Sequence, residues 1–332
     1  MQSTVPNEDL IQHLLKTYYR NDAEQQEGGG KEFISSHWRH YGDLCEAQTD
    51  GKGHLGLLKG AAFGTCQWSG RRHQLVDQIC ILTHLAHLPH RRRLLELKAI
   101  AAKICDAMGL NPTLDVFRQV CSLALLERHL TRDMRCKRLN VLMIGDGYGV
   151  LSALFKELFP DSTIVMVDIG RVLLFQANYC QKAHPNYIHK LVSRDVGADS
   201  IDFMYCPAEH LAMLERFEFD IAVNIASMQE MNSSTIADYF TFLRKHLRPG
   251  NLFYCCNRES KTLVEGEVST FLDYPWQDDD RFLMDGFCPW HRYFFARGHA
   301  KNGPHLFGAR IPFVHYYDGI HRHRLAVLAT HA

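Results

Sequence analysis

Three glycines that follow a short apolar segment are the residues whose types and spacing point most directly to chemistry. The segment 141–144 is apolar, and Gly145, Gly147 and Gly149 come directly after it, before a helical pattern begins. Glycine allows a sharp turn and lets a ligand approach the backbone where a Cβ would block it. The following helix directs free N–H groups and the positive end of its dipole towards that ligand. The order of strand, glycine loop and helix therefore predicts a cofactor-binding site.

Asp168 is the second candidate in this site. It ends the next apolar segment, 23 residues after Gly145. A carboxylate in this position can accept hydrogen bonds from both ribose hydroxyls, which NAD and S-adenosyl-L-methionine (SAM) share. The glycine spacing distinguishes the two cofactors, because a dinucleotide site prefers a third glycine five residues after the first. Here Gly149 comes four residues after Gly145 and Val150 takes the dinucleotide position, so the loop favours SAM.

Alternating strands and helices must position this loop. The strand candidates are residues 140–145, 162–170, 201–206, 219–226, 252–257 and 323–329. The helical patterns between them are residues 150–159, 171–183 and 233–247. Strands that alternate with helices at this spacing predict an α/β fold, in which a parallel sheet carries helices on both faces.

The first 130 residues have a different pattern, which is mainly helical. The helical segments are residues 10–18, 74–88, 92–108 and about 112–130. Gly109 is a stop signal, and Asn111 and Pro112 suit the N-cap and the first helical position of the last helix. We therefore divide the chain into a mainly helical region, 1–130, and an α/β region, 131–332.

Composition excludes several classes of protein. The 37 Lys and Arg residues balance 37 Asp and Glu residues, so net charge is zero and a nucleic-acid partner that needs a bulk positive field is not expected. No segment approaches the roughly 18 apolar residues of a membrane span, and we expect a soluble, cytoplasmic protein. The 11 cysteines are scattered without a CxxC pair, so we expect mostly buried thiols and neither a disulfide framework nor a zinc site of familiar spacing.

From about residue 138 to residue 330 the chain resembles the class I SAM-dependent methyltransferases. The resemblance rests on the glycine loop, Asp168 and the segments 206–211, 219–231 and 236–256. It implies a Rossmann-like, mostly parallel sheet with an antiparallel strand near the C-terminus, and SAM as cofactor with S-adenosyl-L-homocysteine as product. The chain departs from the family pattern at Met143 and Cys206, where members have an acidic residue.

The resemblance also implies which residues contact the cofactor. They are Gly145, Asp146, Gly147, Tyr148, Gly149, Asp168, Ile169, Ala208, Glu209, Asn224 and Ser227. In the family, the backbone N–H groups that correspond to those of Ala208 and Glu209 read the adenine edge. Region 131–332 is then the SAM-binding domain, and region 1–130 covers it on the acceptor side.

A narrower resemblance is to the sugar O-methyltransferase family. It is carried by residues 226–231, 239–247, 252–261, 274–280, 288–291 and 318–329. It implies methyl transfer to a hydroxyl of a sugar or glycoconjugate, so that the partner is a small-molecule or glycan acceptor.

Such a reaction needs a group that takes the hydroxyl proton, because a sugar hydroxyl is a poor nucleophile. The candidates for this base are Glu230, His291 and His321. Gln229, Asn257, Arg258, Trp290 and Asp318 are candidates for binding the acceptor. Each has a structural alternative: a solvated carboxylate, a packed histidine, a salt-bridged loop or a core tryptophan.

A metal ion is the other way to mask that proton. The cluster His315, Asp318, His321 and His323 and the acidic run 278–280 contain ligand types, but neither has a spacing that assigns a metal. A divalent metal therefore stays an open alternative, and no metal ligand is assigned.

Three rival functions remain open at this point. The first is the same catalyst acting on another small molecule or a peptide, for which an apolar, aromatic-lined pocket is expected. An NAD-dependent oxidoreductase is disfavoured by the glycine spacing. A non-catalytic SAM-binding or scaffold protein is favoured slightly by Met143 and Cys206. The sequence gives no indication of oligomeric state.

Overall fold

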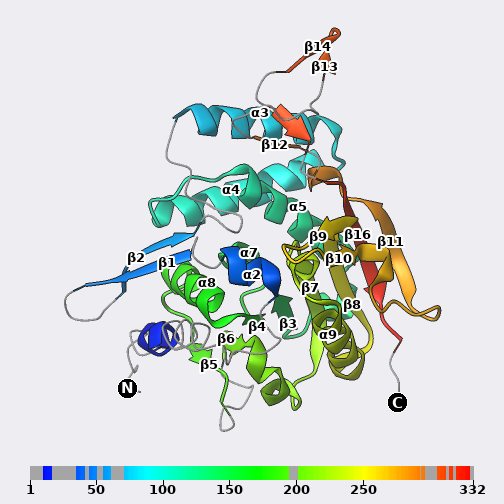
Figure 1. The fold of residues 1–332 in the computed structure, drawn as a ribbon. Helices are drawn as coiled ribbons and strands as arrows, with labels where there is room; N and C mark the ends of the chain where they lie inside the picture. Colours follow the sequence, from blue (N-terminus) through cyan, green and yellow to red (C-terminus); the bar gives the residue numbers. More distant parts are fainter. Residues whose placement is uncertain are drawn as a thin grey trace.

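A computed structural model describes residues 10–16, 35–41, 45–50, 55–60, 71–193, 201–291, 293–295, 305–311, 314–316 and 319–329 (Figure 1). The central strands are β3 (Asn140–Ile144), β4 (Thr163–Asp168), β5 (His189–Leu191), β6 (Phe203–Pro207), β7 (Phe219–Ile225), β8 (Leu247–Arg258), β11 (Arg281–Phe287) and β16 (His321–Val327). Within the described chain they form one eight-stranded sheet in the order β11-β16-β8-β7-β3-β4-β6-β5.

Strand direction confirms the predicted fold class. β3 pairs in parallel with β4 and β7, and the parallel pairing continues to β5 on one side and to β8 on the other. β16 is antiparallel to both β8 and β11. The described sheet is therefore mostly parallel with one antiparallel strand near the C-terminus, as expected for a Rossmann-like methyltransferase sheet.

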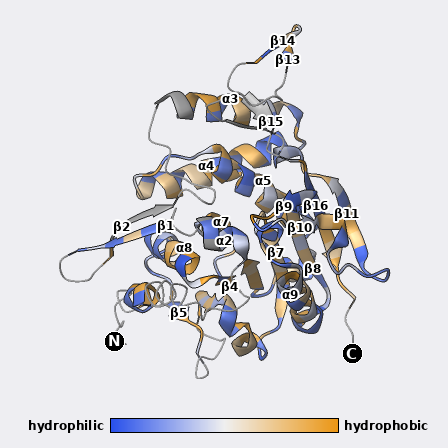
Figure 2. Cartoon of the chain, viewed as in Figure 1, coloured by the Kyte–Doolittle hydropathy of each residue, from blue (hydrophilic) through white to orange (hydrophobic). Residues whose placement is uncertain are grey.

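Alternate residues of the strands separate into two hydrophobic clusters. Val141 and Met143 pack with one cluster, whereas Leu142 and Ile144 pack with the other. The helices of the first face include α7 (Val150–Leu158) and α8 (Gly170–Ala183), and α9 (Ser233–His246) covers the second. Figure 2 shows hydrophilic and hydrophobic residues together on α8 and α9, as expected for helices with one face on a sheet.

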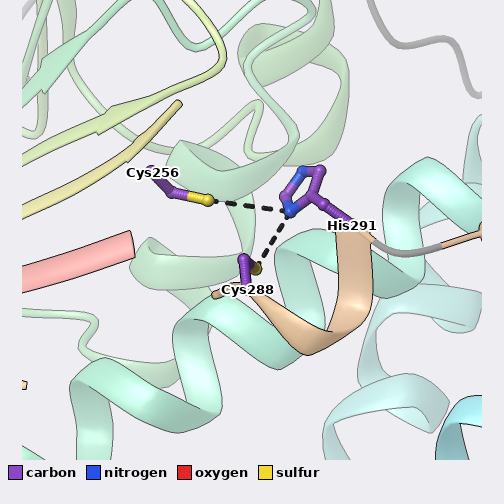
Figure 3. Close-up of side chains that lie close together, drawn as sticks. All are labelled: Cys256, Cys288 and His291. Atoms are coloured by element: carbon purple, nitrogen blue, oxygen red, sulfur yellow. Dashed lines mark hydrogen bonds between the residues drawn. The ribbon is translucent and has the colours of Figure 1, made fainter. Parts of the chain in front are cut away.

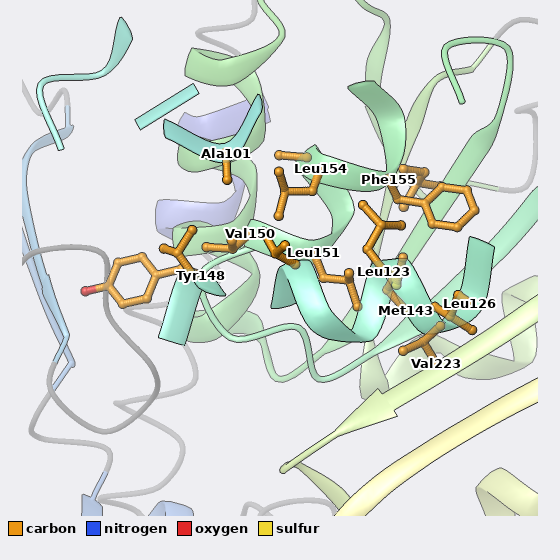
Figure 4. Close-up of a cluster of buried hydrophobic side chains, with 14 of the residues drawn as sticks. Ala101, Leu123, Leu126, Met143, Tyr148, Val150, Leu151, Leu154, Phe155 and Val223 are labelled. Atoms are coloured by element: carbon orange, nitrogen blue, oxygen red, sulfur yellow. The ribbon is translucent and has the colours of Figure 1, made fainter. Parts of the chain in front are cut away.

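The N-terminal region adds helices to the first face. They are α2 (Ser36–Tyr41), α3 (Arg71–His87), α4 (Arg91–Ala107) and α5 (Leu114–His129), and the short α6 (Arg132–Arg135) follows at the start of the α/β region. Ala101 of α4, Leu123 of α5 and Leu154 of α7 belong to one buried cluster, which reaches Met143 in the sheet (Figure 4). The division drawn at residue 130 thus falls inside a continuous hydrophobic core.

Smaller elements complete the described chain. They are β1 (Cys45–Thr49), β2 (Leu55–Gly60), β9 (Ser260–Thr262), β10 (Val268–Thr270), β12 (Tyr293–Phe295), β13 (His305–Leu306), β14 (Ala309–Arg310), β15 (Val314–Tyr316), and the 3₁₀ turns η3 (Ala208–Leu214), η4 (Met228–Glu230), η5 (Phe271–Asp273) and η6 (Pro289–His291). None of the described helices has both the length and the apolarity that crossing a bilayer requires.

Most predicted helices and strands are confirmed to within a few residues, and one expectation needs correction. The mainly helical N-terminal region also contains an antiparallel hairpin of β1 and β2, for which no strands were predicted. The cap of α5 is Thr113 rather than Asn111: its hydroxyl accepts a hydrogen bond from the Val116 N–H, 3.4 Å away. Asp77 of α3 adds a second cap by accepting from the Leu114 N–H at 2.9 Å, which fixes the start of α5 two residues later than predicted.

Candidate active site

A cavity of about 410 Å³ lies at the carboxyl ends of β3, β4 and β7. β4 is the neighbour of β3 on one edge and β7 is its neighbour on the other, so the strand order reverses at β3. Ligands of open α/β sheets bind in the crevice at such a reversal of strand order. The described lining is His37, Trp38, Asp115, Val116, Arg118, Gln119, Met143, Ile144, Gly145, Asp146, Gly147, Tyr148, Val150, Leu151, Asp168, Val172, Val223, Ile225, Ala226, Ser227, Gln229, Glu230, Arg258, Lys261 and His291.

Two glycines of the loop are required by its geometry. Gly145 has a φ of 71°, and a Cβ there would lie 1.9 Å from the Oγ of Ser227. Gly149, the N-cap of α7, has a φ of 88°, and its Cβ would lie 3.1 Å from the Sγ of Cys180. Both positions therefore exclude a side chain, through backbone conformation and through close packing.

Asp146 lines the cavity but also caps a helix. Its carboxylate accepts a hydrogen bond from the N–H of Ser152 at 2.8 Å, in the first turn of α7. Burial raises the pKa of Asp146 to about 6, although the bonds to Ser152 oppose this. The loop is thereby held against the N-terminus of α7.

Asp168 places a largely desolvated carboxyl group in the same cavity. One oxygen accepts from the Ile169 N–H at 2.8 Å, and the other accepts from the side-chain amide of Gln176 at 2.7 Å. Burial raises the pKa of Asp168 to about 8, and these two hydrogen bonds only partly oppose it. The two donors orient the carboxyl group at the end of β4, where the sequence predicted a ribose contact.

This raised pKa predicts a pH-dependent free energy of unfolding. The carboxyl group of Asp168 titrates near 3.8 in the unfolded chain and near 8 in the folded one. Its contribution to stability is therefore complete below pH 4 and is lost as pH rises to about 8. Urea denaturation at several pH values should show that wild type loses stability over this window relative to Asp168→Asn. Identical pH profiles would contradict the burial of an ionisable group here.

Glu230 is at the centre of a charged cluster on the other side of the cavity. Its Oε1 accepts a hydrogen bond from Lys261 Nζ at 2.6 Å and lies 3.3 Å from the Nε2 of His37. Burial raises the pKa of Glu230, and Lys261 opposes the rise. Burial, together with Lys261 and Arg258, lowers the pKa of His37 to about 4, so His37 is neutral at pH 7. The cluster thus combines a carboxylate, a neutral imidazole and two cationic groups.

A buried amide network holds the turn that carries Glu230. The side-chain oxygen of Gln229 accepts from the Arg258 N–H at 2.7 Å, and Asn257 Oδ1 accepts from the Gln229 N–H at 3.1 Å. Asn257 also donates to Asn224 Oδ1 at 2.8 Å, and Asn224 donates to the carbonyl of Ile144 at 2.9 Å. Gln229 lines the cavity, whereas Asn224 and Asn257 are not among the described lining residues. The geometry therefore gives these two asparagines a positioning role.

The structure places some of the remaining predicted site residues at the cavity and others away from it. His291 lines the cavity, and His321 lies behind it with the two rings stacked 4.7 Å apart. Gly149, Ile169, Ala208, Glu209 and Trp290 are absent from the described lining. Asp318 lies outside the described residues.

Trp290 is buried, and its indole N–H donates to the Oγ of Ser122 in α5 at 3.2 Å. Trp290→Phe should lower the free energy of unfolding by about 2 kcal/mol, because a hydrogen bond and packed volume are lost together. Urea denaturation measures this change. The matched comparison is Trp276→Phe, which removes an indole bond to the Phe271 carbonyl on the other face of the sheet. A free energy of unfolding equal to that of wild type in Trp290→Phe would contradict a stabilising role for the bond to Ser122.

Several lining residues were not predicted from the sequence. His37 and Trp38 come from α2, and Asp115, Arg118 and Gln119 come from α5. Arg118 is buried, and its guanidinium donates to the Trp290 carbonyl at 3.1 Å and to Asp115. An arginine within the apolar pattern of residues 114–126 was a usable signal for this site. The short segment around His37 has no comparable signal.

The acidic run 278–280 does not form a cation site. Asp280 accepts two hydrogen bonds from Arg244, at 2.7 and 2.9 Å, and two more from backbone N–H groups of Gln277 and Ala329. Its carboxylate is thus fully used in a buried ion pair. The side chain of His315 lies outside the described residues.

Comparison with known proteins locates similar folds. No family model and no curated protein matches the chain. Among solved structures, it is similar to TrmN from Thermus thermophilus, with 15% identity and a TM-score of 0.36 over 63% of this chain and 48% of that one. It is also similar to magnesium protoporphyrin IX methyltransferase (ChlM) from Synechocystis PCC 6803 with bound SAH, with 13% identity and a TM-score of 0.38 over 63% and 81%. A third is TehB from Haemophilus influenzae, with 12% identity and a TM-score of 0.39 over 58% of each chain.

The fold assignment rests on the sheet itself. Its strand order, the antiparallel β16 between β8 and β11, and the cavity at the β3–β7 reversal define the Rossmann-like class of methyltransferase folds.

Proposed function

We propose that this chain is a SAM-dependent methyltransferase. The proposal rests on one observation above all: the desolvated carboxyl group of Asp168 and the glycine loop at Gly145 line the same cavity. Asp168 would accept the ribose hydroxyls of SAM, and the loop would pass close to the rest of the cofactor. The cofactor-binding assignments of Tyr148 and Ser227 fit this arrangement, because both also line the cavity.

We further propose that the methyl acceptor is a hydroxyl group of a sugar or glycoconjugate. The acceptor side of the cavity is formed by Glu230, His37, Lys261, Arg258 and Gln229, all of which can form hydrogen bonds with hydroxyl groups. An apolar, aromatic-lined pocket would have favoured a different small molecule. The polar lining therefore supports a hydroxyl-rich acceptor.

SAM, when bound, would supply an electrophilic methyl group with S-adenosyl-L-homocysteine as the leaving group, and the cavity residues would hold the acceptor hydroxyl for in-line attack. The product would be a methyl ether. Glu230 accepts the hydroxyl proton, while Lys261 and His37 hold its carboxylate in place. His291, on the cavity wall, orients the acceptor.

Two measurements test the proposal in sequence. Calorimetric titration should detect SAM and S-adenosyl-L-homocysteine but not NAD. Incubation with methyl-labelled SAM and a panel of nucleotide sugars, glycans, phenols and peptides should then transfer label to carbohydrate. Binding of NAD alone would overturn the cofactor assignment, and label only on phenols or peptides would overturn the acceptor class. SAM binding without transfer to any acceptor would favour a non-catalytic SAM-binding protein.

A further inference from the structure

Cys256, Cys288 and His291 form a buried cluster of metal-ligand types, and neither cysteine has a part in the proposed methyl transfer (Figure 3). The Nδ1 of His291 lies 3.2 Å from the Sγ of Cys288 and 3.7 Å from the Sγ of Cys256. All three ligand atoms lie within 4.8 Å of one another. Figure 3 shows both sulfur atoms directed towards the same ring nitrogen.

These distances suit a tetrahedral zinc ion. Zinc binds thiolate sulfur at about 2.3 Å and imidazole nitrogen at about 2.0 Å, so tetrahedral angles place neighbouring S and N ligands about 3.6 Å apart. The two observed S–N distances, 3.2 and 3.7 Å, lie on either side of that value. An ion at the centre of the cluster would therefore require only small side-chain movements.

The surrounding chain holds the three ligands rigidly. Cys256 is in β8, and Cys288 is anchored by its backbone N–H, which donates to the His321 carbonyl at 2.8 Å. The turn η6, which carries His291, is fixed to α5 by the bonds from Arg118 to the Trp290 carbonyl and from Trp290 to Ser122. Such preorganisation lowers the cost of binding an ion.

His323 is the nearest candidate for a fourth position, although it is outside the group of three whose ligand atoms lie within 4.8 Å of one another. It is directly opposite Cys256 of β8 in the antiparallel register of β16, and it also interacts with Cys288. Its Nδ1 is 3.2 Å from the hydroxyl of Tyr254, which leaves Nε2 as the ligand atom. Metal-bound histidines commonly have such a partner on the other ring nitrogen.

We propose that Cys256, Cys288 and His291 bind a Zn²⁺ ion, with His323 as the fourth ligand. The ion would connect η6 to β8 and β16 and so fix the position of His291 at the cavity wall. The sequence shows only part of this site: Cys288 and His291 are three positions apart, whereas Cys256 is 32 positions before Cys288. This inference does not depend on the methyltransferase proposal.

The test uses the full chain purified with a reducing agent and without added chelator. Elemental analysis should find one equivalent of zinc, and Co²⁺ substitution should give the absorption bands of tetrahedral thiolate coordination. Cys256→Ala and Cys288→Ala should each weaken zinc binding at least about 100-fold in competition with a chromogenic chelator. The matched control, Cys105→Ala, removes a buried thiol in α4 and should retain full zinc affinity.

A second measurement needs no variant and covers the case in which the variants fail to fold. Treating wild type with a zinc chelator should increase the alkylation rate of Cys256 and Cys288 but not that of Cys105. Absence of zinc together with absence of cobalt bands would overturn the proposal. A disulfide between Cys256 and Cys288 would also overturn it. So would cobalt bands that persist when Cys256→Ala and Cys288→Ala are combined in one chain.

Discussion

Glu230→Gln is expected to lower kcat by about 10²–10⁴-fold while SAM affinity stays unchanged. The carboxylate of Glu230 is held by Lys261 at 2.6 Å in the cavity, so it is placed to accept a proton. Glutamine keeps the shape of the side chain and removes the basic oxygen. Because burial raises the pKa of Glu230, the acid limb of the wild-type kcat profile should lie at a higher pH than for an ordinary glutamate.

Labelled-methyl turnover and calorimetric titration of SAM measure the two halves of this prediction. The matched control is Glu215→Gln, which changes a solvent-exposed glutamate after η3 and should leave kcat unchanged. His37→Gln identifies the rival base, because the neutral imidazole of His37 is next to Glu230. If Glu230→Gln keeps full turnover and His37→Gln loses it, then His37 and not Glu230 is the base.

Gly145→Ala should abolish measurable SAM binding and lower the free energy of unfolding by about 3 kcal/mol. An alanine here is strained at a φ of 71°, and its Cβ would overlap Ser227, whose Oγ lies 1.9 Å away. The loop must therefore move away from the end of β7, which opens the cavity at the point where the cofactor is proposed to bind. Calorimetric titration and urea denaturation measure the two effects.

Gly266→Ala is the control that separates the effect of backbone strain from the effect of atomic overlap. Gly266 also has a positive φ, 91°, but its Cβ would have no described atom within 4 Å. Gly266→Ala should therefore lower the free energy of unfolding by about 1 kcal/mol and leave SAM affinity unchanged. Adding Ser227→Gly to Gly145→Ala removes the overlapping atoms and should restore part of the SAM affinity. Wild-type affinity in Gly145→Ala itself would contradict the role given to the loop.

The sheet and the glycine loop were predictable because their signals are local. Apolar runs that end in glycine or aspartate identified β3 and β4, and residue order alone then placed Gly145 and Asp168 together. The edge strands β5 and β11 and the hairpin of β1 and β2 were missed. β1 and β5 have too few apolar residues to form a pattern.

The acceptor side could be predicted only in part. Glu230 was found because it follows a strand, whereas His37 reaches it from 193 positions away in the chain. No pattern in one sequence reports such a contact. Gln176 and Arg118 are intermediate cases, because each is a polar residue within the buried positions of an amphipathic helix. Such residues are buried with a partner, and the partner here is part of the site.

The hydrophobic core shared by α4, α5 and α7 limits how this protein can evolve. In a chain with separable domains, one acceptor-binding region can be exchanged for another while the catalytic domain is retained. Here Leu123 and Leu126 of α5 belong to the same buried cluster as Leu151 and Leu154 of α7, the helix that begins at the glycine loop (Figure 4). Replacing residues 1–130 would remove packing from that helix and expose its apolar face. Residues 1–130 therefore cannot be exchanged as a unit without repacking α7, whereas single residues of the cavity lining can be substituted in place.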